Sequence, residues 1–103
     1  MTASYYNLSG TSVQSLTPIS SGDQLRTIDR LLICNTDTTA VTVSLYLDNG
    51  AGTTYKLLHL TSIPVGVTLD FLNGVPITYG SKYKLDIVLG NAAYTADVIC
   101  NII

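Results

Sequence analysis

The stretch AVTVSLYLD, residues 40–48, decides the fold class. Its apolar residues, Val41, Val43, Leu45 and Leu47, alternate one by one with polar residues or Tyr. A period of two residues is typical of a β-strand with one buried face. The loop DNGAG at 48–52 follows, and its two glycines suit the positive φ angles of a hairpin loop. Because TTYKLLHLTSI at 53–63 reads as a returning strand, we expect a β-hairpin here.

Four further strands are expected downstream of this hairpin. VTLDFL and VPITY flank Asn73-Gly74, a pair that suits the two positive φ angles of a type I′ turn and so predicts a second hairpin. Pro76 has no N–H for a ladder, so its strand is expected at a sheet edge. Gly80-Ser81 ends that strand, and KYKLDIVL and AYTADVICNII, both alternating, complete the series.

The residues upstream of the hairpin also read as extended. QLRTIDRLLICN, residues 24–35, predicts a long strand, because its Ile and Thr content and flanking turns argue against a helix. TASYYNL and SVQSL are weaker extended segments. Seven to eight short antiparallel strands spaced about ten residues apart predict an all-β fold, a single small β-sandwich of jelly-roll or Ig-like type. We expect an N-terminal arm or edge segment at 1–20 and the sandwich domain at 21–103.

Composition limits the classes of partner. Charged residues make up 12% of the 103 residues, against roughly a quarter in typical soluble domains, so part of the surface is expected to be covered by a partner. The five basic residues form no dense patch, which argues against nucleic acid. No apolar run approaches the roughly 20 residues that span a bilayer, and no signal peptide is visible, so we expect no membrane and synthesis in a cytoplasm.

The sequence carries no recognisable catalytic, cofactor or metal motif. His59 is the only histidine, and no C-x-x-C, G-x-S-x-G or G-x-G-x-x-G occurs. The loop at 48–52 lacks the ligand count of a calcium loop. We therefore expect no catalytic residue, no cofactor and no metal, and a protein that is not an enzyme. Cys34 and Cys100 are expected to be free thiols, or a disulfide if their strands are neighbours.

Seven tyrosines suggest either ordinary strand packing or a contact surface. Tyr5 and Tyr6 are adjacent, so in a strand they face opposite ways, and one can pack while the other meets a partner. A sugar-binding site, with Tyr55, Tyr79 or Tyr94 stacking on the ligand, is the alternative.

From residue 25 to 103 the chain resembles small virion proteins of tailed bacteriophages. The resemblance rests on an apolar strand ending in Asn35-Thr36-Asp37, an alternating strand, a tyrosine-bearing strand, the turn Pro64-Val65-Gly66, a glycine-delimited meander and an apolar last strand. The chain departs from the family pattern at Gly80-Ser81, where Gly-Asp is common, and its first 20 residues are not covered.

The resemblance implies a structural role in the virion after synthesis in the host cytoplasm. The implied function is a capsid decoration (cement) subunit that binds the major capsid protein, or else a neck or tail component. It also implies a homo-oligomer, with a trimer favoured because decoration often sits at local three-fold positions. The expected partner contacts are Tyr5, Tyr6, Asn49, Asn73 and Pro76. A carbohydrate- or receptor-binding β-sandwich is the alternative function.

Overall fold

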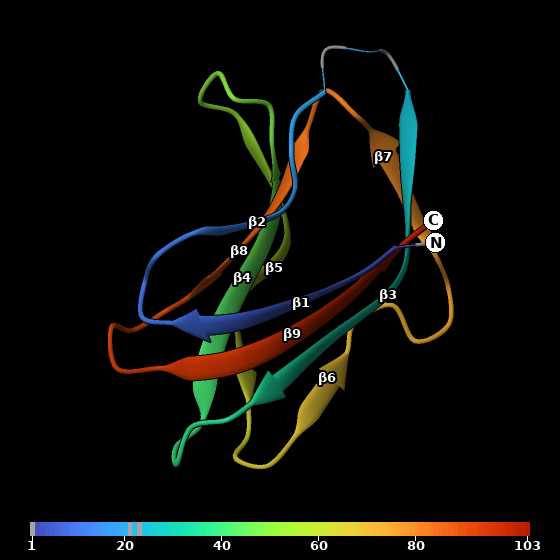
Figure 1. Cartoon of the computed structure of the whole chain (residues 1–103). Helices are drawn as coiled ribbons and strands as arrows, with labels where there is room; N and C mark the ends of the chain where they lie inside the picture. The colour runs from blue at the N-terminus through green and yellow to red at the C-terminus, as the bar shows by residue number, and fades with distance from the viewer. Residues whose placement is uncertain (1, 21, 23) are drawn as a thin grey trace.

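The computed structural model describes residues 2–20, 22 and 24–103, and within them it is all-β. Two antiparallel sheets pack face to face as a small β-sandwich, which confirms the expected fold class (Figure 1). The described residues form nine strands, more than the seven to eight expected, because both weak N-terminal segments are strands. The strands are β1 (Thr2–Ser9), β2 (Gln14–Thr17), β3 (Leu25–Asn35), β4 (Val41–Asp48), β5 (Thr54–Ile63), β6 (Thr68–Asp70), β7 (Ile77–Gly80), β8 (Lys84–Leu89) and β9 (Thr95–Ile102).

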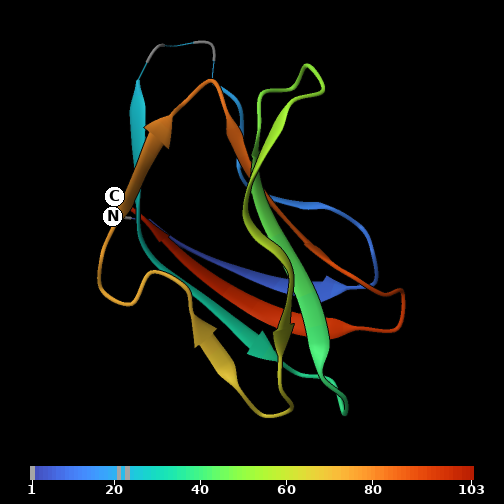
Figure 2. The same cartoon turned by 180° about the vertical axis from the view of Figure 1, so that it is seen from behind.

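The two sheets differ in how sequence neighbours are distributed. The four-stranded sheet has the order β2-β8-β4-β5 and contains the expected β4–β5 hairpin, whose loop glycines Gly50 and Gly52 have φ angles of 76° and 94°. The five-stranded sheet has the order β1-β9-β3, and β6 and β7 both pair with the far side of β3. The first and last strands are therefore neighbours, as Figure 2 also shows.

The core lies between the inner faces of the two sheets. The alternation that defines β4 buries Val41, Val43 and Leu45 completely. The alternate residues of β8 and β9 are buried in the same way, namely Leu85, Ile87, Leu89, Ala96, Val98 and Cys100. Burying an aliphatic side chain of this size stabilises the fold by roughly 1.5–3 kcal/mol. The fully buried large side chains of the core are Ile28, Leu31, Ile33, Leu45, Ile63, Leu85, Ile87, Val41, Val43 and Val98.

The prediction of a hairpin at Asn73-Gly74 is wrong, although the predicted turn forms. Asn73 and Gly74 have φ angles of 49° and 84°, and the Val75 N–H donates to the Leu72 carbonyl over 3.0 Å, as in a type I′ turn. However, β6 and β7 do not pair with each other. Both run antiparallel to β3 and follow one another along it, so the turn lies in a loop that interrupts one long edge strand. Pro76 precedes β7 at this edge, which agrees with its missing N–H.

The N-terminal segment belongs to the sheets. β1 pairs with β9 over its whole length, and Leu8 lies in the core. β2 forms the edge of the opposite sheet beside β8. The boundary expected between residues 20 and 21 touches residue 21, which lies outside the described residues.

Candidate functional site

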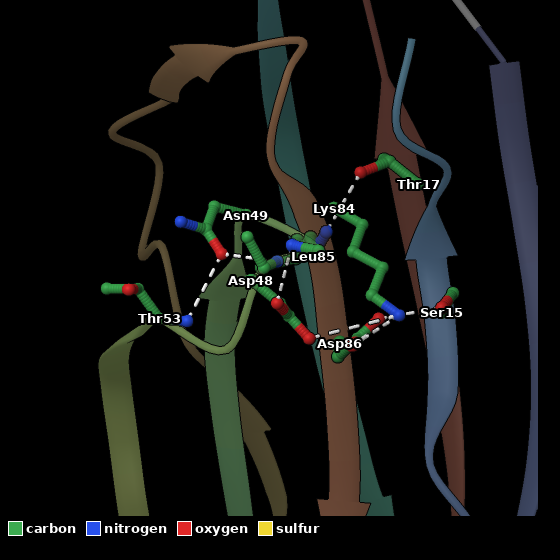
Figure 3. Close-up of polar contacts among 10 residues, drawn as sticks. Ser15, Thr17, Asp48, Asn49, Thr53, Lys84, Leu85 and Asp86 are labelled. Carbon is green, nitrogen blue, oxygen red and sulfur yellow. Dashed lines mark hydrogen bonds and ion pairs between the residues drawn. The ribbon is translucent and has the colours of Figure 1, made fainter.

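The outer face of the four-stranded sheet carries a polar network centred on Asp86. Figure 3 shows its carboxylate between Ser15 and Lys84. The Ser15 hydroxyl donates to Asp86 Oδ1 over 2.7 Å, and Lys84 Nζ lies 3.5 Å from Asp86 Oδ2 and 3.9 Å from Asp48 Oδ2. Asp86 is only 1% exposed, so both partners are needed to keep its charge satisfied. Lys84 and Asp86 are two residues apart on β8, so their side chains lie on the same face of the sheet.

The network continues across the sheet through an aromatic side chain. The strand register places Ser15, Asp86, Tyr46 and Lys56 in one row. Lys56 Nζ lies 4.2 Å from the centre of the Tyr46 ring, a cation–π contact. Burial, and then the charges of Asp86 and Asp48, raise the pKa of Tyr46. On this face Lys84 thus meets two carboxylates, and Lys56 meets the Tyr46 ring.

The outer face of the five-stranded sheet is different, because an apolar row crosses it. The register sets Tyr5 of β1 opposite Ile99 of β9, and Ile99 opposite Leu32 of β3. Tyr5 is 72% exposed and Ile99 38% exposed, while Leu32 is half-buried. We call these three residues the Tyr5 row. Aromatic and aliphatic side chains are the groups enriched in the centres of protein interfaces.

Polar groups border the Tyr5 row on both sides. On one side, Asn7 Nδ2 donates to Asp97 Oδ1 over 2.7 Å, and this pair links β1 to β9. On the other side, Arg30 lies in register with Asn101 and has a guanidinium nitrogen 3.8 Å from Asp70 Oδ2. An apolar centre with a polar margin is the usual pattern of a protein-binding surface.

The structure separates the other predicted contact residues. Tyr6 points inward, packs against the core, and its hydroxyl donates to the Leu16 carbonyl over 3.4 Å. Asn49 Oδ1 accepts the N–H groups of Ala51 and Thr53, so this side chain shapes its own loop (Figure 3).

Two predicted contact residues remain on a different side of the molecule. Asn73 and Pro76 are exposed in the β6–β7 loop beside Val75, which is 71% exposed. Figure 1 shows this loop and the β4–β5 loop on different sides of the molecule, so the five predicted residues do not form one patch. Of the five predicted contact residues, Tyr5 alone lies on the apolar row of the five-stranded sheet.

The tyrosines proposed for sugar stacking also separate. Tyr79 is 6% exposed and lies in the core, so its expected role on a surface is wrong. Tyr94 is half-buried against the core. Tyr55 is 54% exposed and meets the ring of Tyr83 edge-on, with 5.9 Å between the ring centres.

Both cysteines are free, although their strands are neighbours. The register pairs Cys100 with Leu31, whose side chain is in the core, and pairs Cys34 with the exposed Asp97. The two thiols therefore lie on opposite faces of the sheet. Burial raises the pKa of Cys100 to about 11.

Three structurally important polar residues have no clear sequence signal. Asn35 is buried and its amide donates to the Thr39 and Ile63 carbonyls, each over 2.9 Å. Ser81 is also buried, and its hydroxyl donates to the Gly22 carbonyl over 2.8 Å. Thr17 contacts Tyr79 between the sheets. Each needs a contact distant in sequence, which a local pattern does not specify.

Within residues 2–20, 22 and 24–103, no pocket and no group of three metal-ligating side chains is found. No helix in the described part of the chain is long and apolar enough to cross a membrane. Comparisons with protein-family models, curated proteins and solved structures give no match.

Proposed function

We propose that this chain is a non-enzymatic structural subunit that binds other proteins through the outer face of its five-stranded sheet. The observation that carries the proposal is the Tyr5 row, in which Tyr5 and Ile99 are exposed side by side within a polar margin. The opposite outer face is a weaker candidate, because Lys84, Asp48 and Asp86 already satisfy one another there. The outer face of the five-stranded sheet is therefore the better candidate for a protein-binding surface.

Within this role, the subunit is a capsid decoration (cement) protein in the virion of a tailed bacteriophage. The resemblance of residues 25–103 to small virion proteins supports this assignment. The low content of charged residues, 12%, suits a chain that spends its working life in a permanent interface. Its partner is then the major capsid protein, with a neck or tail position as the alternative. Self-association into a homo-oligomer belongs to the same proposal.

The test measures attachment to purified phage heads. Tyr5→Ser should weaken co-sedimentation of the chain with heads at least about tenfold, because an exposed aromatic anchor is lost. Tyr55→Ser is the matched control, since Tyr55 is also a well-exposed tyrosine but lies on the other sheet. Equal binding of wild type and Tyr5→Ser would remove the Tyr5 row from the proposal.

Copy number distinguishes the possible positions in the particle. Quantitative mass spectrometry of purified virions should give hundreds of copies for a decoration subunit and about a dozen or fewer for a neck or tail subunit. Absence of the chain from the particles would overturn the virion assignment. Tyr55 beside Tyr83 favours one second candidate, glycan binding, and glycan-array signal lost in Tyr55→Ser but kept in Tyr5→Ser would support it.

A further inference from the structure

We propose that the free edge of β1 pairs with β1 of a second copy of this chain, antiparallel and about a two-fold axis, so that two five-stranded sheets join into one. The inference deepens the proposed structural role and names a partner, but it depends on the edge of the sheet rather than on a capsid. Its test uses the purified chain alone, so it can fail or succeed independently of attachment to phage heads.

The edge of β1 is long, regular and uncharged. Its eight residues, TASYYNLS, pair with β9 from Thr2↔Ile102 to Ser9↔Thr95 without a break in register. They include no Asp, Glu, Lys, Arg or Pro. Natural sheets normally block their edges with charges, prolines, bulges or short strands, since an open edge is a template for another strand.

The other edges of the described strands carry such blocks. β5 shifts register twice against β4, and within it Leu60 has a φ angle of 48°, which is unusual for a leucine. β2 has four residues and a register shift. β6 and β7 have three and four residues and are separated by a loop that contains Pro76. Among the described strands, β1 is thus the edge that is left open.

The ladder identifies which backbone groups of β1 face the open side. The Gly10 N–H donates to the Tyr94 carbonyl over 3.0 Å, so the even-numbered residues of β1 point their backbone groups toward β9. Backbone direction alternates along an antiparallel strand, so the N–H and C=O groups of Ala3, Tyr5 and Asn7 point away from β9. These side chains lie on the outer face, together with Ile99.

This parity determines how two copies can pair. In an antiparallel ladder, two opposite residues point their backbone groups either both toward the other strand or both away from it, so odd-numbered residues pair with odd-numbered residues. One such register sets Tyr5 opposite Tyr5 of the second copy, and Ala3 opposite Asn7 of the second copy. It joins the two Tyr5 rows end to end in one apolar stripe, and a cross-strand aromatic pair lies at its centre. No like charges meet, because β1 has none.

A second copy suits this edge better than an unrelated strand. The edge carries no charge that would select a charged partner, whereas its own sequence fulfils the backbone parity and continues the Tyr5 row. The pairing has two-fold symmetry, so it predicts a dimer, or an assembly of dimers, in place of the trimer that the resemblance implies.

Charge substitutions at Tyr5 test the pairing. Sedimentation of the wild-type chain should show a monomer–dimer equilibrium. Tyr5→Lys and Tyr5→Glu should each raise the dimer Kd at least about tenfold, because like charges then face each other across the axis. An equimolar mixture of the two variants should recover dimers, as opposite charges meet. Because Tyr5 is 72% exposed, both variants should unfold at the wild-type temperature in dilute solution, where the wild type is also monomeric. Tyr55→Lys is the control and should leave the Kd unchanged.

Two further measurements separate edge pairing from contact between sheet faces. In a Cys34→Ser background, Tyr5→Cys should form a cross-linked dimer under mild oxidation, while Asn7→Cys should not, because Asn7 faces Ala3 of the second copy. The amide N–H groups of Tyr5 and Asn7 should exchange more slowly as protein concentration rises.

Each of these results has an opposite that overturns the inference. The inference is wrong if the wild-type chain stays monomeric up to about 1 mM, or if it sediments as a trimer. Failure of the mixed charge variants to associate, or amide exchange at Tyr5 that ignores concentration, also contradicts pairing through the β1 edge. A cross-link in Asn7→Cys without one in Tyr5→Cys excludes the proposed register.

Discussion

The hydroxyl groups of Thr17 and Tyr79 lie 2.6 Å apart inside the core, and their hydrogen bond connects the two sheets. Thr17 lies on β2 and Tyr79 on β7, and the Thr17 oxygen also accepts the Leu85 N–H over 3.2 Å. A buried hydroxyl is costly unless its hydrogen bonds are made, so this contact favours one packing of the sheets over its alternatives.

Tyr79→Phe should lower the free energy of unfolding by about 1–2 kcal/mol, because the Thr17 hydroxyl loses a buried partner. Thr17→Val should be more damaging, since it leaves both the Tyr79 hydroxyl and the Leu85 N–H without a partner. Urea denaturation of the two single variants and the double variant measures both effects. If Tyr79→Phe has the same effect in the Thr17→Val background as in wild type, the two hydroxyls are not coupled.

Lys84→Met should destabilise the fold by about 1–3 kcal/mol, because the buried Asp86 carboxylate then keeps only its bond from Ser15. Lys82→Met is the matched control, since Lys82 is an exposed lysine two residues away, and its effect should stay within about 0.5 kcal/mol. Urea unfolding midpoints give the comparison. Equal effects of the two substitutions would mean that the Asp86 network adds nothing to stability.

Alkaline pH should destabilise the protein through Cys100, whose pKa is raised by burial from 9.0 to about 11. The folded state favours the neutral thiol, so this stabilisation is complete below pH 9 and is lost as the pH rises toward 11. Linkage over this difference amounts to about 2–3 kcal/mol. Burial also raises the pKa of Tyr79, which adds to the loss above pH 10.

Urea unfolding measured across this pH range tests the assignment to Cys100. Cys100→Ala should lower stability at neutral pH but flatten the decline between pH 9 and the pKa of about 11. Cys34→Ala is the control and should keep the wild-type slope. An unchanged slope in Cys100→Ala would assign the decline to other groups.

Gly90→Ala should destabilise the fold by about 1–3 kcal/mol, because a Cβ at this position would collide with the Thr42 hydroxyl oxygen. Thr42→Ala should restore most of the loss, since the nearest remaining side-chain atom of residue 42 would lie at an ordinary contact distance. Gly80→Ala is the control, because the nearest atom to its added Cβ is Tyr83 Cδ1 at 4.0 Å. Thermal unfolding of the four variants completes the cycle, and a loss that persists in the double variant would contradict this cause.

The sequence predicts local conformation well and strand partners less well. Alternation identifies β4, β8 and β9 and their buried faces, because period two reports directly which side of a strand faces the core. Asn73-Gly74 correctly predicts two positive φ angles but not a hairpin. The choice of partner depends on burial of the flanking side chains against β3, and eleven residues of β3 offer room for both β6 and β7.

For the candidate site too, the sequence predicts the local conformation but not the partner strand. Adjacent residues of a strand face opposite ways, so the sequence implies that Tyr5 and Tyr6 differ, but it does not say which one points outward. That choice is made by β9, which sets Tyr5 opposite the exposed Ile99 and Tyr6 opposite the buried Val98. The Tyr5 row joins three strands from both ends of the sequence, so no local pattern indicates it.

The position of β9 between β1 and β3 also has a consequence for biosynthesis. A ribosome releases β9 last among these strands, although both β1 and β3 need it as their partner. During translation β1 therefore has no partner strand at either edge until β9 emerges from the ribosome. Sheets of this kind, rich in contacts between distant parts of a chain, fold slowly and expose aggregation-prone strands. We expect yield in cells to depend on how quickly residues 95–102 follow, and slow codons placed before this segment should lower it.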